Sequence, residues 1–160
     1  MEKENRDMAL KTLNYLCNGS QIEGVIFHGL RVLLSENENN SHRIDGQISI
    51  NIESGIKVFQ SMPETDPESN EIPNLDWVES AKILCELRLK KIVDVKLGQE
   101  TPHLYLILQS GEVLFINGHH DKFESWQVEV QNNTLENEVF LVAACPGDDL
   151  AVWVPGDILE

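Results

Sequence analysis

The chain has 160 residues, of which 41% are hydrophobic, and its formal net charge is −15, with 27 acidic against 12 basic residues. This length and this apolar fraction suit a single globular domain over residues 1–160 and exclude a disordered chain, and no apolar run is long enough to span a bilayer. The negative charge disfavours binding to nucleic acid or to anionic membranes, and it favours a basic partner.

The N-terminal segment Met1 to Asp7 carries mixed charges and lacks the apolar core of a signal peptide. The cysteines Cys17, Cys85 and Cys145 lie far apart among apolar neighbours and form no Cys-x-x-Cys pair. An odd number of cysteines at such spacing favours buried thiols over a disulfide framework or a zinc site. We therefore expect a soluble, cytoplasmic protein with buried thiols and with no cofactor.

The first elements expected along the chain are a helix and a β-rich stretch. Apolar residues recur at helical spacing between Met8 and Cys17, and Asn18-Gly19 is a typical helix end. The stretch from Ile22 to Leu34 is rich in residues that favour strands and is interrupted by glycines, so it predicts one bent strand or two short strands.

Two loops and two further strands are expected before residue 75. Residues 35–46 predict a polar loop, after which "QISINIES" alternates apolar and polar residues as a half-buried strand does. "GIKVF" predicts another short strand. Residues 60–74 contain three prolines, four acids and no base, which predicts an exposed and mobile acidic loop within the domain.

A second helix is expected from about Leu75 to Leu87, with Asn74 or Asp76 as its N-cap. Its apolar residues form a stripe at helical spacing, which favours a role in the core over a cofactor site. The residues of this stripe are Trp77, Val78, Ala81, Leu84 and Cys85.

The second half of the chain contains six segments typical of strands: "KIVDVKL", "HLYLILQ", "EVLFIN", "SWQVEV", "EVFLVAA" and "LAVWV". Gln109-Ser110-Gly111 and Pro146-Gly147-Asp148-Asp149 predict tight turns between neighbouring segments. Because parallel strands need long crossover connections, short turns favour antiparallel pairing. The fold predicted for the whole chain is α+β, with a curved, mainly antiparallel sheet or a partly open barrel and two covering helices.

The stretch "NGHHDKFESW", residues 117–126, is the strongest candidate in the sequence for a metal or acid–base site, because it contains His119, His120 and Asp121 in succession. In an extended strand the two histidines would point to opposite faces, and no spacing here matches a known zinc motif. We therefore favour a solvated turn that leads into a strand anchored by Trp126. A metal-dependent enzyme that uses these three residues is the less favoured alternative.

Other catalytic patterns are weaker. No Gly-x-Ser-x-Gly motif and no phosphate-binding glycine loop occurs, and Cys145 before Pro146-Gly147 is the remaining candidate nucleophile. We expect no catalytic residue, no metal ligand and no enzymatic activity.

A binding function agrees better with the charge distribution. From Phe123 to the C-terminus the sequence contains eight acids and no Lys or Arg, together with Trp126 and Trp153. Aromatic residues surrounded by charge are a common interface composition, although a tryptophan is more often a core residue. Acidity alone also keeps proteins soluble, so charge does not by itself establish a binding site.

The residue pattern of "LRLKKIVDVKL", "LYLILQSGEVLFI" and "FESWQV", between about Leu87 and Val130, resembles the pattern found in small uncharacterised bacterial proteins. Some of those proteins are immunity-like members of toxin–immunity systems. The resemblance implies a non-enzymatic α+β protein that binds one partner. It assigns no site residue.

An acidic inhibitor of a basic toxin has a physical rationale, because carboxylates on a rigid scaffold can occupy a positively charged cleft and speed association. We predict that the binding residues are Glu124, Asp148, Asp149 and Asp157, with Trp153 as the apolar anchor. The expected partner is a basic protein. The alternative is a small binding or regulatory domain with another ligand.

Overall fold

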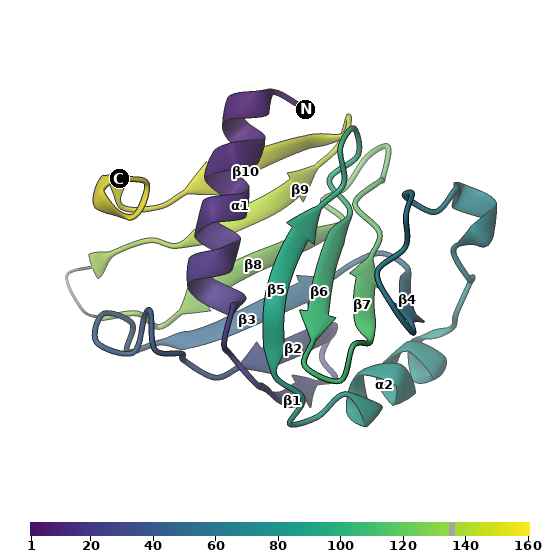
Figure 1. The fold of residues 1–160 in the computed structure, drawn as a ribbon, viewed down its shortest axis with the longest axis horizontal. Helices are drawn as coiled ribbons and strands as arrows, with labels where there is room; N and C mark the ends of the chain where they lie inside the picture. The colour runs from purple at the N-terminus through teal and green to yellow at the C-terminus, as the bar shows by residue number, and fades with distance from the viewer. Residues whose placement is uncertain (135–136) are drawn as a thin grey trace.

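The computed structural model describes residues 1–134 and 137–160, and within them the chain forms two α-helices and ten strands (Figure 1). The strands form two antiparallel sheets, and neither sheet closes into a barrel. The predicted α+β architecture with antiparallel sheet is therefore confirmed. Among the described residues, neither helix combines the length and the apolarity needed to cross a membrane.

The larger sheet has the strand order β1-β2-β3-β8-β9-β10. Its strands are β1 (Ile22–Ile26), β2 (Leu30–Leu34), β3 (Gln47–Ile52), β8 (Trp126–Gln131), β9 (Leu141–Cys145) and β10 (Asp149–Trp153). Since β1 and β2 form a hairpin, the stretch from Ile22 to Leu34 is two short strands. Pairing of β3 with β8, from Gln47 opposite Gln131 to Ile52 opposite Trp126, joins the two halves of the chain.

The smaller sheet has the order β4-β7-β6-β5. Its strands are β4 (Ile56–Phe59), β5 (Ile92–Leu97), β6 (Leu104–Leu108) and β7 (Val113–Ile116). The turn between β6 and β7 is the predicted one, and Gly111 adopts a φ of 93° in it, which a glycine tolerates without strain. Strands β5, β6 and β7 therefore form the predicted run of sequential antiparallel strands.

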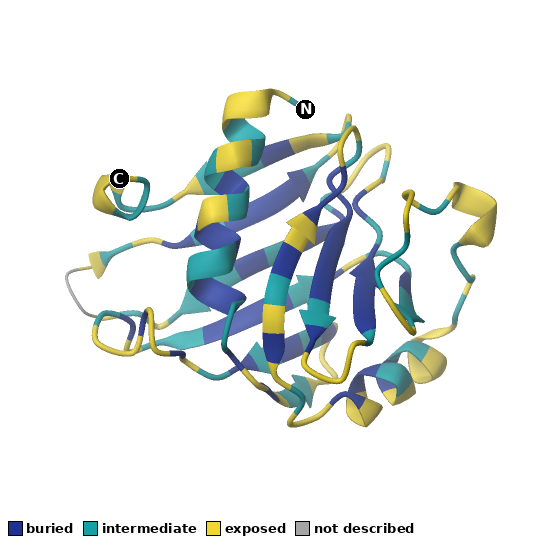
Figure 2. Cartoon of the chain, in the orientation of Figure 1, coloured by how far each residue is buried: buried dark blue, intermediate teal, exposed yellow. Residues whose placement is uncertain are grey.

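The smaller sheet and helix α1 (Lys3–Cys17) lie side by side over the same face of the larger sheet (Figure 1). The inner faces of both sheets and the inward side of α1 are buried, whereas the solvent side of α1 is exposed (Figure 2). Alternation along each strand explains this pattern, since Ile48, Ile50 and Ile52 all point into the core from β3. The opposite face of the larger sheet is left without a covering helix or strand among the described residues.

The polar loop 35–46 has a structural role that its composition does not reveal. The side-chain amide of the buried Asn40 donates to the carbonyl oxygen of Tyr15 at 2.9 Å, and that of Asn37 donates to the carbonyl oxygen of Leu16 at 3.2 Å. These amides satisfy carbonyl groups at the C-terminal end of α1 that have no partner within the helix. The loop therefore holds the end of α1 against the larger sheet.

Helix α2 (Trp77–Glu86) begins at the predicted cap, where the Asp76 carboxylate accepts from the backbone N–H of Glu79 at 2.8 Å and the Glu79 carboxylate accepts from that of Asp76 at 2.9 Å. The assignment of its whole apolar stripe to the core was wrong. Ala81 and Leu84 are buried, but Trp77, Val78 and Cys85 are exposed. The helix lies at the edge of the larger sheet beside β1 and β2, so only a narrow side of it is covered.

The cysteines also differ from the expectation that all three are buried. Cys17 is fully buried in α1, and burial raises the pKa of its thiol to about 12. Cys145 is partly buried and Cys85 is exposed. The expectation of a buried thiol therefore holds for Cys17 alone among the three.

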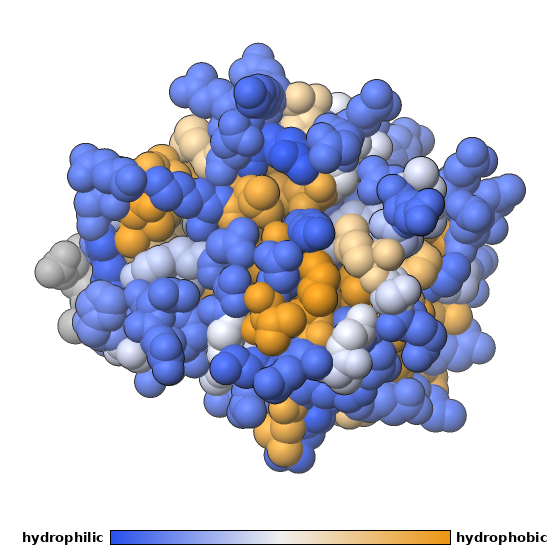
Figure 3. Space-filling model, in the orientation of Figure 1, coloured by the Kyte–Doolittle hydropathy of each residue, from blue (hydrophilic) through white to orange (hydrophobic). Residues whose placement is uncertain are grey.

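The acidic segment 60–74 lies against the outer side of the smaller sheet. Its Met62 and Ile72 pack against a small cluster formed by Tyr105, Val113 and Phe115. A short 3-10 helix, Ser69–Glu71, follows the run of prolines and acids. On this side of the molecule apolar side chains reach the surface over β5 and β6 and are surrounded by hydrophilic ones (Figure 3).

Candidate functional site

The face of the larger sheet that points away from the core, here called the outer face, is the candidate site. Strand alternation sends Ser49 and Asn51 of β3 to this face, as the sequence predicts, together with Glu129 of β8 and Trp153 of β10. Cross-strand pairing places Glu129 beside Leu141 and Leu141 beside Trp153. The outer face therefore brings together residues that are far apart in the sequence.

Carboxylates on and beside the outer face are oriented by amides. The Asn51 amide donates to Glu53 at 3.1 Å, the Gln131 amide donates to Glu129 at 3.1 Å, and the Gln127 amide donates to Glu124. Because an amide is neutral, these hydrogen bonds restrict the carboxylates without cancelling their charge. The arrangement presents three ordered negative charges, with two basic side chains near them: Arg31, which is paired with Asn51 across the strands, and Lys122, which lines the same hollow as Glu53 and Glu124.

One row across the outer face, here called the end row, consists of Glu53, Ser125, Cys145 and Asp149. The backbone N–H of Glu53 donates to the carbonyl of Ser125 at 2.9 Å, and Cys145 is paired with Asp149. Burial raises the pKa of the Cys145 thiol, and the negative charges of Glu124 and Asp149 raise it further. This environment disfavours the thiolate that a cysteine nucleophile needs.

Several buried polar atoms of the outer face have no hydrogen-bond partner among the described residues. They are Ser49 Oγ, Ser125 Oγ and Arg31 Nε. Buried polar groups in native proteins are nearly always paired, so unpaired groups call for an explanation.

The stretch at residues 117–126 contributes Ser125 to the end row, and its histidines lie beside that row. His119 Nδ1 is 2.7 Å from Asp148 Oδ1, in the turn between β9 and β10, and His119 Nε2 is 3.5 Å from Asp121 Oδ1. The hydrogen bond with the Asp148 carboxylate raises the pKa of His119. Trp126 is fully buried and its Nε1–H donates to the carbonyl of Pro102 at 2.8 Å, as expected for a residue that anchors a strand.

Replacing Asp148 by Asn is expected to lower the pKa of His119, because the neutral amide no longer favours the imidazolium. Since the folded-state pKa is raised, the contact stabilises the protein fully below the ordinary histidine pKa, and this stabilisation is lost as the pH rises through the raised value. An NMR titration of the histidine ring signals measures the change. The matched control is Asp149→Asn, which removes the adjacent charge and spares the contact; an equal effect of both variants would contradict the assignment.

His119 and His120 do not converge on one centre. The Nδ1 of His120 accepts from the backbone N–H groups of Lys122 and Phe123 at 3.1 and 3.0 Å, so this nitrogen is used within the turn. The His120 ring lies beside that of Phe123, with centroids 5.2 Å apart, rather than beside His119. Within the described part of the chain, no group of three or more His, Cys, Asp or Glu side chains is arranged to hold a metal ion.

The five predicted binding residues do not form one cluster on the surface. Glu124 and Asp149 lie at the end-row side of the outer face, and Asp148 contacts His119 beside them. Trp153 lies at the other end of β10 and is 53% exposed. Asp157 lies in the short helix Gly156–Ile158, where it forms an ion pair with Arg43.

Arg43 connects the C-terminal segment to the rest of the chain. Its guanidinium contacts Glu138 at 2.6 Å and Asp157 at 2.5 Å, and hydrogen bonds from Arg43 lower the pKa of both carboxyl groups. The charge of Asp157 is thus partly balanced within the chain. This contact makes Asp157 less available to a partner than the acids of the outer face.

We expect Glu138→Gln to lower the free energy of unfolding at neutral pH by about 1 kcal/mol, because it removes one carboxylate from Arg43. The pKa of Glu138 is lowered in the folded state, so the stabilisation is present above the ordinary glutamate pKa and is lost as the pH falls through the lowered value. Urea denaturation at about pH 7 and about pH 3 should show a smaller difference from the wild type at the lower pH. Glu129→Gln, which removes an acid held by an amide, is the control, and a difference that is undiminished in acid would contradict this role.

Sequence reasoning missed Phe123 and Glu53. Phe123 is 67% exposed, and it borders a hollow of about 560 Å³ that is also lined by Glu53 and Glu124. Glu53 continues the alternation of Ser49 and Asn51, so the strand pattern could have placed it on the polar face. Nothing in the sequence distinguishes the exposed Phe123 from a buried phenylalanine.

The comparisons with known proteins are negative. No family model matches the chain, and no curated protein and no solved structure shows significant similarity to it.

Proposed function

We propose that this protein is a non-enzymatic, acidic protein-binding domain whose outer face binds a basic protein, in the manner of an immunity-type inhibitor of a toxin. The observation that carries this proposal is the uncovered outer face, on which neutral amides hold Glu53, Glu124 and Glu129 in place. Exposed aromatic residues border this face, with Phe123 beside the end row and Trp153 at the far end of β10.

The physical basis is electrostatic complementarity. Carboxylates that are already ordered lose little conformational entropy when they meet cations, and unpaired negative charge speeds the encounter with a basic protein. Phe123 and Trp153 supply apolar area of the kind that dominates binding energy at interfaces. The cationic active cleft of a nuclease is one surface with the required properties, which agrees with the resemblance to immunity-like proteins.

A pull-down of the tagged protein from its native cell, at low and at moderate salt, tests the proposal. We expect one basic protein near equal stoichiometry, identified by mass spectrometry, with recovery that falls as salt screens the charges. Recovery of no specific protein, or of a partner that is not basic, would overturn the proposal.

A further inference from the structure

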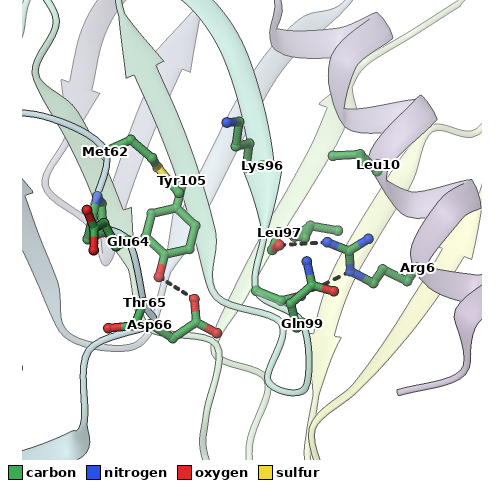
Figure 4. Close-up of a pocket in the computed structure, with 12 residues that line it drawn as sticks. Arg6, Leu10, Met62, Glu64, Thr65, Asp66, Lys96, Leu97, Gln99 and Tyr105 are labelled. Carbon is green, nitrogen blue, oxygen red and sulfur yellow. Dashed lines mark hydrogen bonds between the residues drawn. The ribbon is translucent and has the colours of Figure 1, made fainter.

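A cavity of about 570 Å³ lies where the N-terminal half of α1, the end of β5 and residues 62–66 meet (Figure 4). None of the residues that line it belongs to the outer face of the larger sheet. Its volume lies in the range of roughly 300–1,000 Å³ that is common for small-molecule sites. The cavity is therefore a candidate for a second, separate binding function.

One wall of the cavity is cationic. The Arg6 guanidinium donates from Nε to the carbonyl of Gly98 at 3.1 Å and from Nη2 to the carbonyl of Leu97 at 2.8 Å. Lys96 also lines the cavity, on β5 opposite Tyr105 of β6, and its ammonium group is directed away from Arg6 (Figure 4). Neither Arg6 nor Lys96 forms an ion pair with another described residue, so two positive charges in a strongly acidic chain remain unbalanced by direct contact.

The guanidinium of Arg6 is also held in a fixed orientation. Both of its acceptors are neutral backbone carbonyls, which position the group without cancelling its charge. Within the described part of the chain its Nη1 forms no hydrogen bond, which leaves this nitrogen for a ligand. A planar guanidinium fixed in this way matches the geometry of a carboxylate, which can accept two of its N–H bonds.

The opposing wall is acidic. Tyr105 donates its hydroxyl hydrogen to Asp66 Oδ1 at 2.6 Å, which ties residues 62–66 to the sheet (Figure 4). Burial and the Asp66 carboxylate raise the pKa of Tyr105, so the phenol stays protonated and remains a donor. Asp66 Oδ2 lies so close to Gly98 that a Cβ atom added to this glycine would be only 3.0 Å from that oxygen. Glu64 also lines this wall.

We propose that this cavity binds a zwitterionic amino acid with an apolar side chain. The carboxylate of the ligand is held by Arg6, and the exposed side chain of Lys96 turns toward it and adds a second positive charge. The ammonium group of the ligand is held by Asp66 with help from Glu64. The apolar side chain packs against Leu10 and Met62, which are half-buried at the cavity. A dipolar ligand is favoured over a simple anion because the two charged walls do not pair with each other and carry opposite signs.

The test is a series of ¹H–¹⁵N NMR titrations of the full chain with L-leucine, L-methionine and L-phenylalanine, up to about 10 mM, which detects even weak binding. We expect at least one amino acid to shift the backbone signals of Leu97, Gly98 and residues 64–66. The amide of that amino acid, which lacks the carboxylate, and its N-acetyl derivative, which lacks the ammonium group, should each bind at least about tenfold more weakly.

Variants complete the design. Lys96→Gln should weaken binding of the amino acid about tenfold or more and leave binding of its amide unchanged. Lys91→Gln, which removes the same charge from an exposed lysine outside the cavity, should have no effect. The proposal is overturned if none of the three amino acids shifts these signals, if the N-acetyl derivative binds as tightly as the amino acid, or if Lys91→Gln weakens binding as much as Lys96→Gln does.

Discussion

Trp126→Ala should lower the free energy of unfolding by about 3–5 kcal/mol, which is the range for removing a fully buried tryptophan. The side chain is 0% exposed in the core, between the two sheets, and its loss leaves a large cavity. It also leaves the carbonyl of Pro102 without the donor that Trp126 provides at 2.8 Å. Equilibrium denaturation with urea, followed by circular dichroism, measures the effect.

Trp153→Ala is the matched control for this prediction. Trp153 is 53% exposed at the end of the edge strand β10, so its removal should change the free energy of unfolding by less than about 0.5 kcal/mol. The same variant should weaken binding of the basic partner, because an exposed aromatic at an interface can dominate the binding energy. A large loss of stability in Trp153→Ala, or a small one in Trp126→Ala, would contradict the division between core and surface.

The double variant Glu53→Lys, Asp149→Lys should slow association with the basic partner by about 10- to 100-fold at low salt, and by less at high salt. Both residues are exposed members of the end row and neither forms an ion pair with another described residue, so folding should be preserved. Reversing Asp149 is more informative than reversing Asp148, because Asp148 also holds His119 at 2.7 Å. Stopped-flow or surface-plasmon kinetics with the purified partner gives the rate.

A control variant with the same change in net charge shows whether slower association comes from charges in the end row or from the total charge of the protein. Glu86→Lys with Glu100→Lys reverses two exposed acids that lie outside the outer face, on α2 and in the loop after β5. If the end row contacts the partner, this control should slow association much less than the end-row variant. Equal slowing by both variants would show that only total charge matters and would contradict the site.

Local patterns predicted the elements well, because periodicity and turn residues act over a few positions. The alternation in Gln47–Ile52 predicted both a strand and its polar face, and Asp76 was foreseen as a helix cap. The exposure of Trp77 could not be predicted from the spacing of apolar residues. A helix at the edge of a sheet and a helix over its centre can have apolar residues at the same spacing. Which side of a strand is covered depends on distant parts of the chain.

The features that define the sites come from contacts between distant residues. Pairing of β3 with β8 assembles the outer face, and the ion pair between Arg43 and Asp157 spans 114 positions in the sequence. Arg6 reaches the carbonyl of Leu97 across 91 positions. Sequence reasoning could therefore propose acidic binding residues, but it could not separate Asp157, which is paired within the chain, from the acids of the outer face.

The most direct test of the proposed binding face is hydroxyl-radical footprinting of the complex recovered from the native cell. Phe123 and Trp153 border the outer face and are 67% and 53% exposed, whereas Trp77 and Phe27 are 50% and 52% exposed beside α2. We predict that the partner protects Phe123 and Trp153 from oxidation and leaves Trp77 and Phe27 as reactive as in the free protein. Protection of Trp77 and Phe27 without protection of Phe123 and Trp153 would place the partner on another surface and contradict the account.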